Sequence, residues 1–499
     1  MATPIHLAVR KNFSFVIFES SRRHPQLVSI DFAGCYQIFK QRPGRNLYKN
    51  SADSNGTYMT HLKIISLAVF STIACVTPVL GFAEAPKEGL TEGSTLNILS
   101  RTFYMNRDNR KGQSAPTSNG YSGATAQGFI AKFESGFTQG TVGFGLDAFA
   151  MMGLKLDTGG GRNGGQSSFN VLPVDNHGNA KDEYSKIGGS LKARALDTQV
   201  NAGDVFPSTP VVAFGDSRVL PESFRGVTAT NKSFSGLTIQ GGRLHSMSQP
   251  QSTSMHDGFA TFYAGPVSSP WIGYFGGDYE ATDRLTLGLY GSRLKDAWDQ
   301  KYASASYELP LNNQTTLTTS LNYYNSIDEG KKLLGKFDND IWSAKIALKL
   351  GSNVVSLSHQ RNEGDDDFDY LRQSDSINLA NSIQYSDFNS PKERSWMVTY
   401  NLDMTALGIP GLTFMTRYAK GTDGNYSKAN SVYMRRDSDG TPLRDQKRWE
   451  RDIEAKYIVQ TGSLKDLSLR LRQATTRATA FESDIDEVRL IVEYPLSVL

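Results

Sequence analysis

The end of the chain, Val488-Arg-Leu-Ile-Val-Glu-Tyr-Pro-Leu-Ser-Val-Leu499, decides the fold class. Its apolar residues recur at every second position, opposite Arg489, Glu493 and Ser497. A period of two is that of a β-strand with one apolar and one polar face. One face suits lipid and the other suits water, as in a strand of a transmembrane barrel.

The same alternation recurs upstream, in residues 317–323, 344–350, 396–404 and 467–472. A soluble β-sandwich also alternates, so no single strand decides between the two folds. The connections favour the barrel. Some are tight, such as the turn at Asp466, and others are long and polar, such as residues 159–182, 363–376 and 420–447. Short turns at one rim and long loops at the other are typical of outer-membrane barrels.

Aromatic residues also fit a barrel, because such barrels carry aromatic girdles at both membrane interfaces. The candidates for the girdles are Phe103, Tyr104, Tyr323, Tyr324, Trp396, Tyr418, Tyr457 and Tyr494. Allowing about 23 residues for a strand and its connection, residues 84–499 predict roughly 16 to 18 strands, enough for a water-filled lumen. We therefore expect an all-β fold, a single transmembrane antiparallel β-barrel domain over residues 84–499.

Composition excludes several other classes. With 38% hydrophobic residues and charges scattered along 499 positions, the chain lacks the series of roughly 20-residue apolar runs of a helical transporter. Two cysteines cannot build a disulfide scaffold. Aromatic residues at 11% supply more apolar surface than a disordered chain carries.

One apolar segment predicts export. Residues 59–83 have a short basic start, an apolar run from Ile64 to Leu80 and small residues before Glu84, the pattern of a signal peptide cleaved after Ala83. The alternatives are a membrane anchor and lipid attachment at Cys75. We interpret residues 1–58 as an upstream start extension rather than a domain. Residues 1–83 hold nine basic and three acidic residues, so the chain from Glu84 has a net charge of −3. The sequence contains no basic tract with interleaved aromatic residues, so nothing in it indicates nucleic-acid binding.

Several longer motifs resemble a known family. They are Leu96–Asp108, Phe133–Ala148, Leu379–Phe388, Pro410–Met415 and Asp486–Leu499, in this order. Over residues 90 to 499 the chain resembles the OprD family of outer-membrane carboxylate-specific porins. The resemblance implies a monomeric barrel of 18 strands in the outer membrane lipid, narrowed by inward-folded loops. It also implies passive uptake of small carboxylate-bearing nutrients, either amino acids or small or aromatic organic acids.

A ladder of basic side chains along one wall of the pore is a further implication of the resemblance. Its members would be Arg107, Lys456, Arg470, Arg472 and Arg489. The alternation independently places the last four on polar strand faces. Arg107 is less well fixed, since Arg101 and Met105 share its parity. The alternative is that these groups pair with inward acids such as Glu454 and Glu493 and only brace the lumen.

Two segments are candidates for the constriction. The first begins at Gly203 and ends at Pro221, stiffened by three prolines, and offers Asp216 and Arg218 as substrate contacts. The second is the acidic run from Glu363, with Asp369, Arg372 and Ser374 as candidates and Asp369 suited to a substrate ammonium group. For the first segment the alternative is an ordinary surface loop. For the acidic run a solvated surface segment is the favoured interpretation.

Motifs for other chemistry are absent from the sequence. The glycine-rich run at residues 159–165 lacks the Gly-Lys-Ser/Thr of a phosphate loop, and the histidines lack metal-ligand spacing. No nucleophile elbow is present. We expect no catalytic residues, no metal and no cofactor, hence no enzyme. The competing classes are an outer-membrane enzyme with a catalytic cluster at one rim and a structural or adhesion barrel with a plugged pore.

Overall fold

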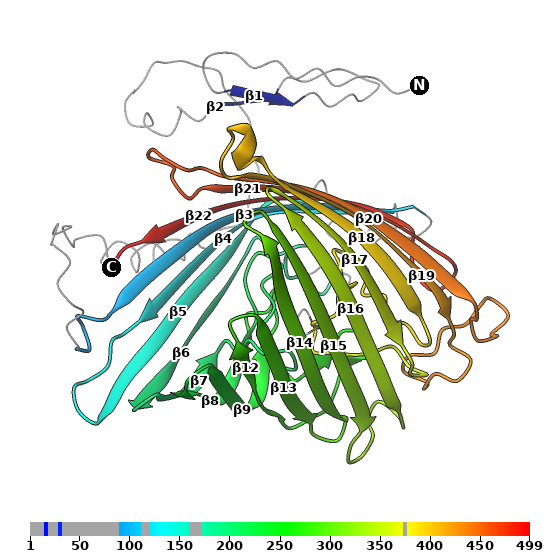
Figure 1. Ribbon diagram of the computed structural model, residues 1–499, viewed down its shortest axis with the longest axis horizontal. Coiled ribbons are helices and arrows are strands. Elements are labelled where there is room, and N and C mark those ends of the chain that lie inside the picture. The colour runs from blue at the N-terminus through cyan, green and yellow to red at the C-terminus, as the bar shows by residue number, and fades with distance from the viewer. Residues whose placement is uncertain (1–13, 18–27, 32–88, 111–119, 159–170, 373–376) are drawn as a thin grey trace, which may run out of the picture. The chain divides into compact units, whose positions relative to one another are not determined.

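The computed structural model describes residues 14–17, 28–31, 89–110, 120–158, 171–372 and 377–499. The chain divides into two compact units, Met1–Phe82 and Ala83–Leu499. In the first unit, strands β1 (Ser14–Ile17) and β2 (Val28–Asp31) pair in antiparallel fashion. The expected signal peptide at 59–83, with Cys75 and Ala83, and the other residues of 1–58 lie outside the described residues. The second unit is a β-barrel (Figure 1).

Eighteen antiparallel strands form one closed barrel, which confirms the predicted fold and the upper end of the predicted strand number. They are β3 (Thr95–Asn109), β4 (Tyr121–Glu134), β5 (Val142–Asp157), β6 (Glu183–Ala195), β7 (Thr198–Val205), β8 (Ser223–Phe234), β9 (Leu237–Ser248), β12 (Ile272–Thr282), β13 (Leu285–Leu294), β14 (Trp298–Asn312), β15 (Thr315–Asp328), β16 (Asp338–Leu350), β17 (Asn353–Asn362), β18 (Arg394–Asp403), β19 (Leu412–Gly424), β20 (Gln446–Ile458), β21 (Ser468–Ala478) and β22 (Ile485–Ser497).

The barrel closes where its last strand meets its first. β22 pairs with β3 over its whole length, from Ile485 opposite Asn109 to Ser497 opposite Asn97. Between β9 and β12 the chain makes a small hairpin, β10 (Ala260–Thr261) with β11 (Gly265–Pro266), and then returns so that β9 and β12 pair directly. Closure leaves no open strand edge, which a sheet in hydrocarbon requires. Among the described residues no helix is long and apolar enough to cross a membrane.

The alternation sorts side chains between two environments. On β22, Leu490 is 40% exposed, whereas its neighbour Arg489 is 4% exposed. The same parity corrects part of the predicted aromatic girdles. Trp396 and Tyr418 are exposed on the outer face, but Phe103 and Tyr324 are buried inside the barrel, because the parity of their strands turns them inward. An aromatic pair in sequence therefore supplies one outward and one inward ring.

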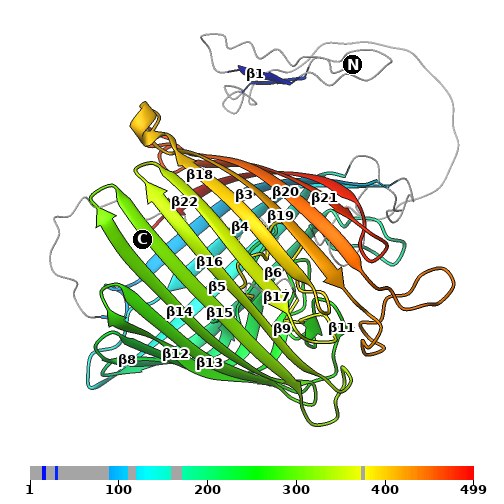
Figure 2. The same cartoon turned by 45° about the vertical axis from the view of Figure 1, so that its right-hand side comes forward.

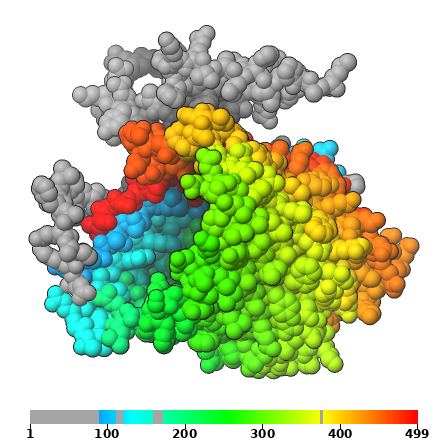
Figure 3. Space-filling model, in the orientation of Figure 1, coloured from blue at the N-terminus to red at the C-terminus, as the bar shows by residue number. Residues whose placement is uncertain are grey.

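The two rims differ as expected. We call the rim at the C-terminal ends of β4 and β22 the turn rim. It carries mostly short connections, such as Gly351-Ser352 between β16 and β17. The opposite loop rim carries the connections 206–222, 249–271, 363–393 and 425–445. The connection at Asp466 is not the tight turn we expected. It spans residues 459–467, with Asp466 in the left-handed region at φ 69°. Figures 2 and 3 show the barrel from two sides, and Figure 3 shows a hollow between the blue and green segments.

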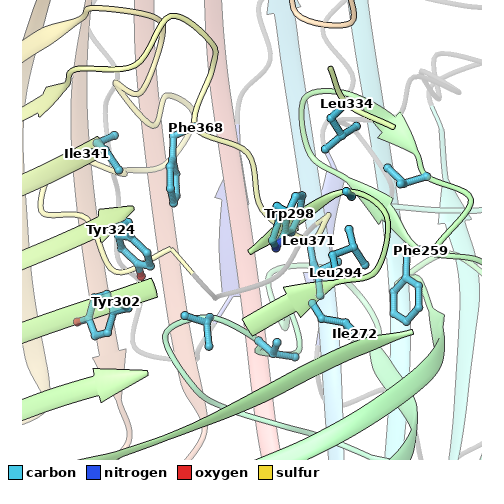
Figure 4. Close-up of a cluster of buried hydrophobic side chains, with 14 of the residues drawn as sticks. Phe259, Ile272, Leu294, Trp298, Tyr302, Tyr324, Leu334, Ile341, Phe368 and Leu371 are labelled. Carbon is cyan, nitrogen blue, oxygen red and sulfur yellow. The ribbon is translucent and has the colours of Figure 1, made fainter. Parts of the chain in front are cut away.

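The long loops pack inside the barrel and form its core with the inward strand residues (Figure 4). Tyr324 on β15 is fully buried, and its hydroxyl donates to the carbonyl oxygen of Pro210 at 2.9 Å. The same hydroxyl accepts from the backbone N–H of Asn378 at 2.9 Å. One wall residue thus holds the 206–222 and 363–393 loops together, and these two loops narrow the lumen.

The sidedness of β22 gives a stability prediction. Leu490 lies near the middle of the strand and Leu496 near the turn rim, both on the exposed face. Placing a charge at the bilayer midplane of a barrel costs about 2–4 kcal/mol, falling to about 0–1 kcal/mol near an interface. Leu490→Lys should therefore lower the free energy of unfolding from lipid vesicles, measured by urea titration, by about 2–4 kcal/mol. Leu496→Lys is the matched control, and an equal cost for both would contradict this assignment.

Candidate functional site

The five predicted ladder residues lie on four neighbouring strands, β20, β21, β22 and β3. In the strand register Lys456 stands opposite Arg470, and Arg472 stands opposite Arg489. Arg107 on β3 stands opposite Glu487, two residues before Arg489 on β22. The sequence-predicted groups are thus brought together on one wall of the barrel, from Lys456 on the turn-rim side to Arg107 on the loop-rim side.

Two carboxylates stand among the guanidinium groups of this wall. Glu454 Oε2 lies 2.8 Å from Arg470 Nη2 and 3.0 Å from Arg472 Nε. Glu487 accepts from Arg489 Nε at 2.6 Å and from Arg107 Nη2 at 2.6 Å. The pairing that would brace the lumen therefore exists. Four guanidinium groups nevertheless share two carboxylates, so the wall keeps an excess of positive charge.

A cavity of about 550 Å³ lies between this wall and the inward loops, among them 206–222, 363–393 and 425–445. Its basic lining comes from Arg107, Arg218, Arg435, Arg472 and Arg489, and its aromatic lining includes Tyr263, Tyr370 and Tyr385. Lys456 and Arg470 do not line it and lie further toward the turn rim. A small anion in this cavity would meet guanidinium groups from three strands and two loops.

Arg218 shows how strongly these charges interact. It sits on the 206–222 loop and is 6% exposed. Burial, together with the positive charges of Arg489, Arg107 and Arg472, lowers the pKa of Arg218 to about 9, although Glu487 opposes the shift. The guanidinium therefore stays charged at neutral pH, at an electrostatic cost that a bound anion would reduce.

Asp216, predicted as a substrate contact, instead holds the loop to the wall. Its two oxygens accept from Arg101 Nη1 at 2.7 Å and Nη2 at 3.1 Å. Arg101 on β3 also donates to Glu493 at 2.7 Å and to the carbonyl oxygen of Arg218 at 2.8 Å. Arg101 is a site residue that the sequence interpretation missed, although it shares the inward parity of Arg107.

The acidic run at 363–370 is not a solvated surface segment, and that interpretation was wrong. Asp369 is 6% exposed, and it accepts from the backbone N–H groups of Tyr263, Ala264 and Tyr370 at 2.9–3.1 Å. The Tyr433 hydroxyl also donates to it at 3.1 Å. The run turns inward because these donors replace water. Asp369 therefore locks loops together rather than presenting a vacant carboxylate.

The other two candidates of this segment do not reach the cavity. Arg372 donates its backbone N–H to Ala260 at 2.9 Å, beside the β10–β11 hairpin, and it is absent from the cavity lining. Burial lowers the pKa of Arg372, while the charge of Glu222 opposes this. Ser374 lies outside the described residues.

The segment 382–387 of the 363–393 loop contacts the basic wall, which the sequence interpretation also missed. The Tyr385 ring centroid lies 4.8 Å from Arg107 Cζ, and the Gln384 carbonyl accepts from Arg489 Nη2 at 3.2 Å. Glu450 on β20 fixes the segment by accepting from the N–H groups of Tyr385 and Ser386 at 2.9 and 2.8 Å. The motif Leu379–Phe388 contained this signal, but only the fold shows which wall it meets.

Among the described residues no cluster of three or more His, Cys, Asp or Glu side chains could hold a metal ion. What the structure does define is a closed barrel with a constricted lumen and one strongly basic wall. This is the architecture of an outer-membrane porin.

Comparison with known proteins agrees with this assignment to the outer-membrane porins. Residues 88–498 match the model of the outer membrane porin, OprD family, and the chain belongs to that family. It is 40% identical to Porin D of Pseudomonas aeruginosa over 449 residues, covering 87% of this chain and 98% of that one. Among solved structures, OccK9 (OpdG) of P. aeruginosa has a TM-score of 0.74 at 33% identity, covering 82% of this chain and all of that one. OpdK of P. aeruginosa with vanillate has a TM-score of 0.72 at 32% identity, with the same coverage. The protein is an outer-membrane porin of a bacterium, and its relatives are channels rather than enzymes.

The contact between the 363–393 and 425–445 loops should depend on pH. Burial raises the pKa of Asp367 to about 7, although Arg435 and the Tyr426 hydroxyl, which donates to it at 3.0 Å, oppose the shift. A free aspartate titrates near 4, so the docked loops hold an extra proton between about pH 4 and 7. The contact between the 363–393 and 425–445 loops therefore becomes less stable as the pH rises through that range.

Amide hydrogen exchange of residues 425–434, corrected for the intrinsic rate, should show less protection at pH 8 than at pH 5. Asp367→Asn keeps an oxygen acceptor for Tyr426 and should remove most of that difference. Greater protection at pH 8 in the native protein would contradict the assignment.

Proposed function

We propose that this porin passes small carboxylate-bearing solutes passively along the wall formed by Arg107, Arg489, Arg472, Arg470 and Lys456. The observation that carries the proposal is the convergence of four guanidinium groups on only two carboxylates beside a cavity of about 550 Å³. The barrel encloses its lumen with its own 18 strands, which supports a channel that works as a monomer.

The physical argument concerns hydration. A carboxylate that enters a narrow lumen loses water, and guanidinium groups replace it with charge-assisted hydrogen bonds where screening is weaker than in bulk. Arg470 and Arg472 are two residues apart on one strand face, about 7 Å. A series of moderate sites at such steps lets the solute move on, whereas one deep site would retain it.

The acids of the wall moderate each site. Glu454 and Glu487 satisfy part of the hydrogen-bonding capacity of their arginines, yet Arg470 Nε makes no hydrogen bond to any described residue. Donors that are partly used attract an anion without trapping it. The aromatic lining of Tyr263, Tyr370 and Tyr385 suits a solute with a planar ring, and the related OpdK was solved with vanillate, an aromatic carboxylate.

Graded charge removal tests the proposal. Arg470→Gln with Arg472→Gln leaves Glu454 unpaired and reverses the local charge, and adding Glu454→Gln restores neutrality. In planar bilayers, anion over cation selectivity and block by benzoate should fall in the order native, triple variant, double variant. Losing one charge-assisted hydrogen bond of about 1.5 kcal/mol corresponds to roughly tenfold weaker block. Raising the salt concentration should weaken block in the native channel.

Lys301→Gln is the control, because Lys301 is exposed on the outer face of β14. Heat-modifiable electrophoretic mobility verifies that each variant is a folded barrel. Native selectivity in both the double and triple variants would contradict the role of the wall. A folded native barrel without conductance would favour the competing classes, a barrel enzyme or a structural barrel.

A further inference from the structure

A second cavity, of about 360 Å³, lies between the 206–222 loop and the strands from β4 to β9 and β12. Lys132 and Glu134, at the turn-rim end of β4, line it. None of the five ladder residues lines this cavity. It is therefore a separate place where a solute could pause on the turn-rim side of the constriction.

Two of the acids in this cavity already have partners. Asp147 accepts from Lys192 Nζ at 2.6 Å and from Asn201 Nδ2 at 3.2 Å. Asp204 accepts from Arg225 through two hydrogen bonds of 2.7 and 2.8 Å. These groups are satisfied within the barrel and leave little capacity for a solute.

Lys132 and Glu134 differ from them. Within the described part of the chain, neither side chain makes an ion pair or a hydrogen bond. The Lys132 ammonium lies 4.3 Å from the ring centroid of Phe206 and 5.7 Å from that of Phe214. Aromatic faces attract a cation. Unlike a carboxylate, however, they do not accept the three hydrogen bonds that an ammonium group can donate. One cation and one anion thus face the same cavity with their hydrogen-bonding capacity unused.

Their spacing fits one kind of solute. Residues two apart on a strand point to the same face about 7 Å apart. In the register Phe149 stands opposite Lys132 and Asp147 stands opposite Glu134, and both partners line the cavity too. The head group of an α-amino acid presents a carboxylate and an ammonium group a few ångströms apart. Its carboxylate can accept from Lys132 while its ammonium group donates to Glu134.

The apolar part of the cavity suits the rest of such a solute. The rings of Phe149, Phe206 and Phe214 form a row with centroid distances of 5.2 and 5.3 Å in edge-to-face geometry. A ring or aliphatic side chain placed along this row would be removed from water. The cavity therefore combines a zwitterion-binding edge with an apolar edge.

We propose that this cavity is a second solute site. It retains zwitterionic α-amino acids that have apolar or aromatic side chains for a longer time than it retains simple carboxylates. The proposal rests on the proposed function, because solutes must first pass the constriction. The basic wall attracts carboxylates in general, whereas Lys132 and Glu134 together distinguish an amino acid from its deaminated analogue.

Two probes of one skeleton test this site in single-channel recordings, added from the turn-rim side: phenylalanine and its deaminated analogue 3-phenylpropionate. Lys132→Gln should shorten the dwell time of block by phenylalanine and by 3-phenylpropionate about fivefold or more. Glu134→Gln should shorten phenylalanine block to a similar extent and leave 3-phenylpropionate block unchanged. Lys301→Gln and Glu183→Gln, both at exposed outward positions, are the matched controls.

Equal effects of Glu134→Gln on phenylalanine and 3-phenylpropionate would overturn the proposal. So would a native dwell time of phenylalanine block in either variant, or no resolvable block by phenylalanine. The double variant of Arg470 and Arg472 separates this site from the wall. If that variant leaves carboxylate passage unchanged while Glu134→Gln still shortens phenylalanine block selectively, the proposed role of the wall fails and the second site stands.

Discussion

Every other feature of this protein depends on one constraint: a sheet in hydrocarbon cannot leave a backbone hydrogen-bond group unpaired. The 18 strands meet it by closing β22 onto β3. Once the sheet is closed, each strand has an outer face for lipid and an inner face for the lumen, with no third choice. The alternation that gives Leu490 to lipid gives Arg489 to the lumen. The basic wall is therefore a direct product of the same periodicity that makes the barrel stable.

The lumen, in turn, is where long loops can fold. Its inward face is polar, so the loops bring carboxylates that find hydrogen-bond donors in place of water. Asp369 accepts from three backbone N–H groups, and Glu450 fixes the segment that carries Tyr385 against Arg107. These contacts narrow the lumen. They leave two cavities, one against five arginines of the wall and loops and one beside Lys132.

The sequence predicts the features that the two-residue period of a strand determines, namely which side chains face the lipid and which face the lumen. The parity of Arg470, Arg472 and Arg489 follows from neighbours on the same strand, so their inward orientation could be inferred without coordinates. Their common wall was an implication of the family resemblance. The loops could not be inferred in this way. Asp369 looks solvated in sequence because three of its four donors, Tyr263, Ala264 and Tyr433, lie more than 60 residues away on other loops. The sequence predicts a substrate contact at Asp216 of the 206–222 loop because its partner, Arg101, lies 115 residues away on β3. Phe103 and Tyr324 were misplaced for a simpler reason, since adjacent aromatic residues cannot share a face.

The central claim is that anions reach the cavity between the basic wall and the inward loops. Both cysteines of the chain, Cys35 and Cys75, precede the barrel, so a protein from Glu84 onward can carry a single new thiol. Ser217 lines the cavity, and Ser217→Cys would place that thiol beside Arg218. The measurement is the rate of its modification by anionic and cationic methanethiosulfonates of similar size, with and without benzoate. Faster reaction with the anionic reagent, slowed by benzoate, is the predicted result. Faster reaction with the cationic reagent, or no protection by benzoate, would contradict the claim.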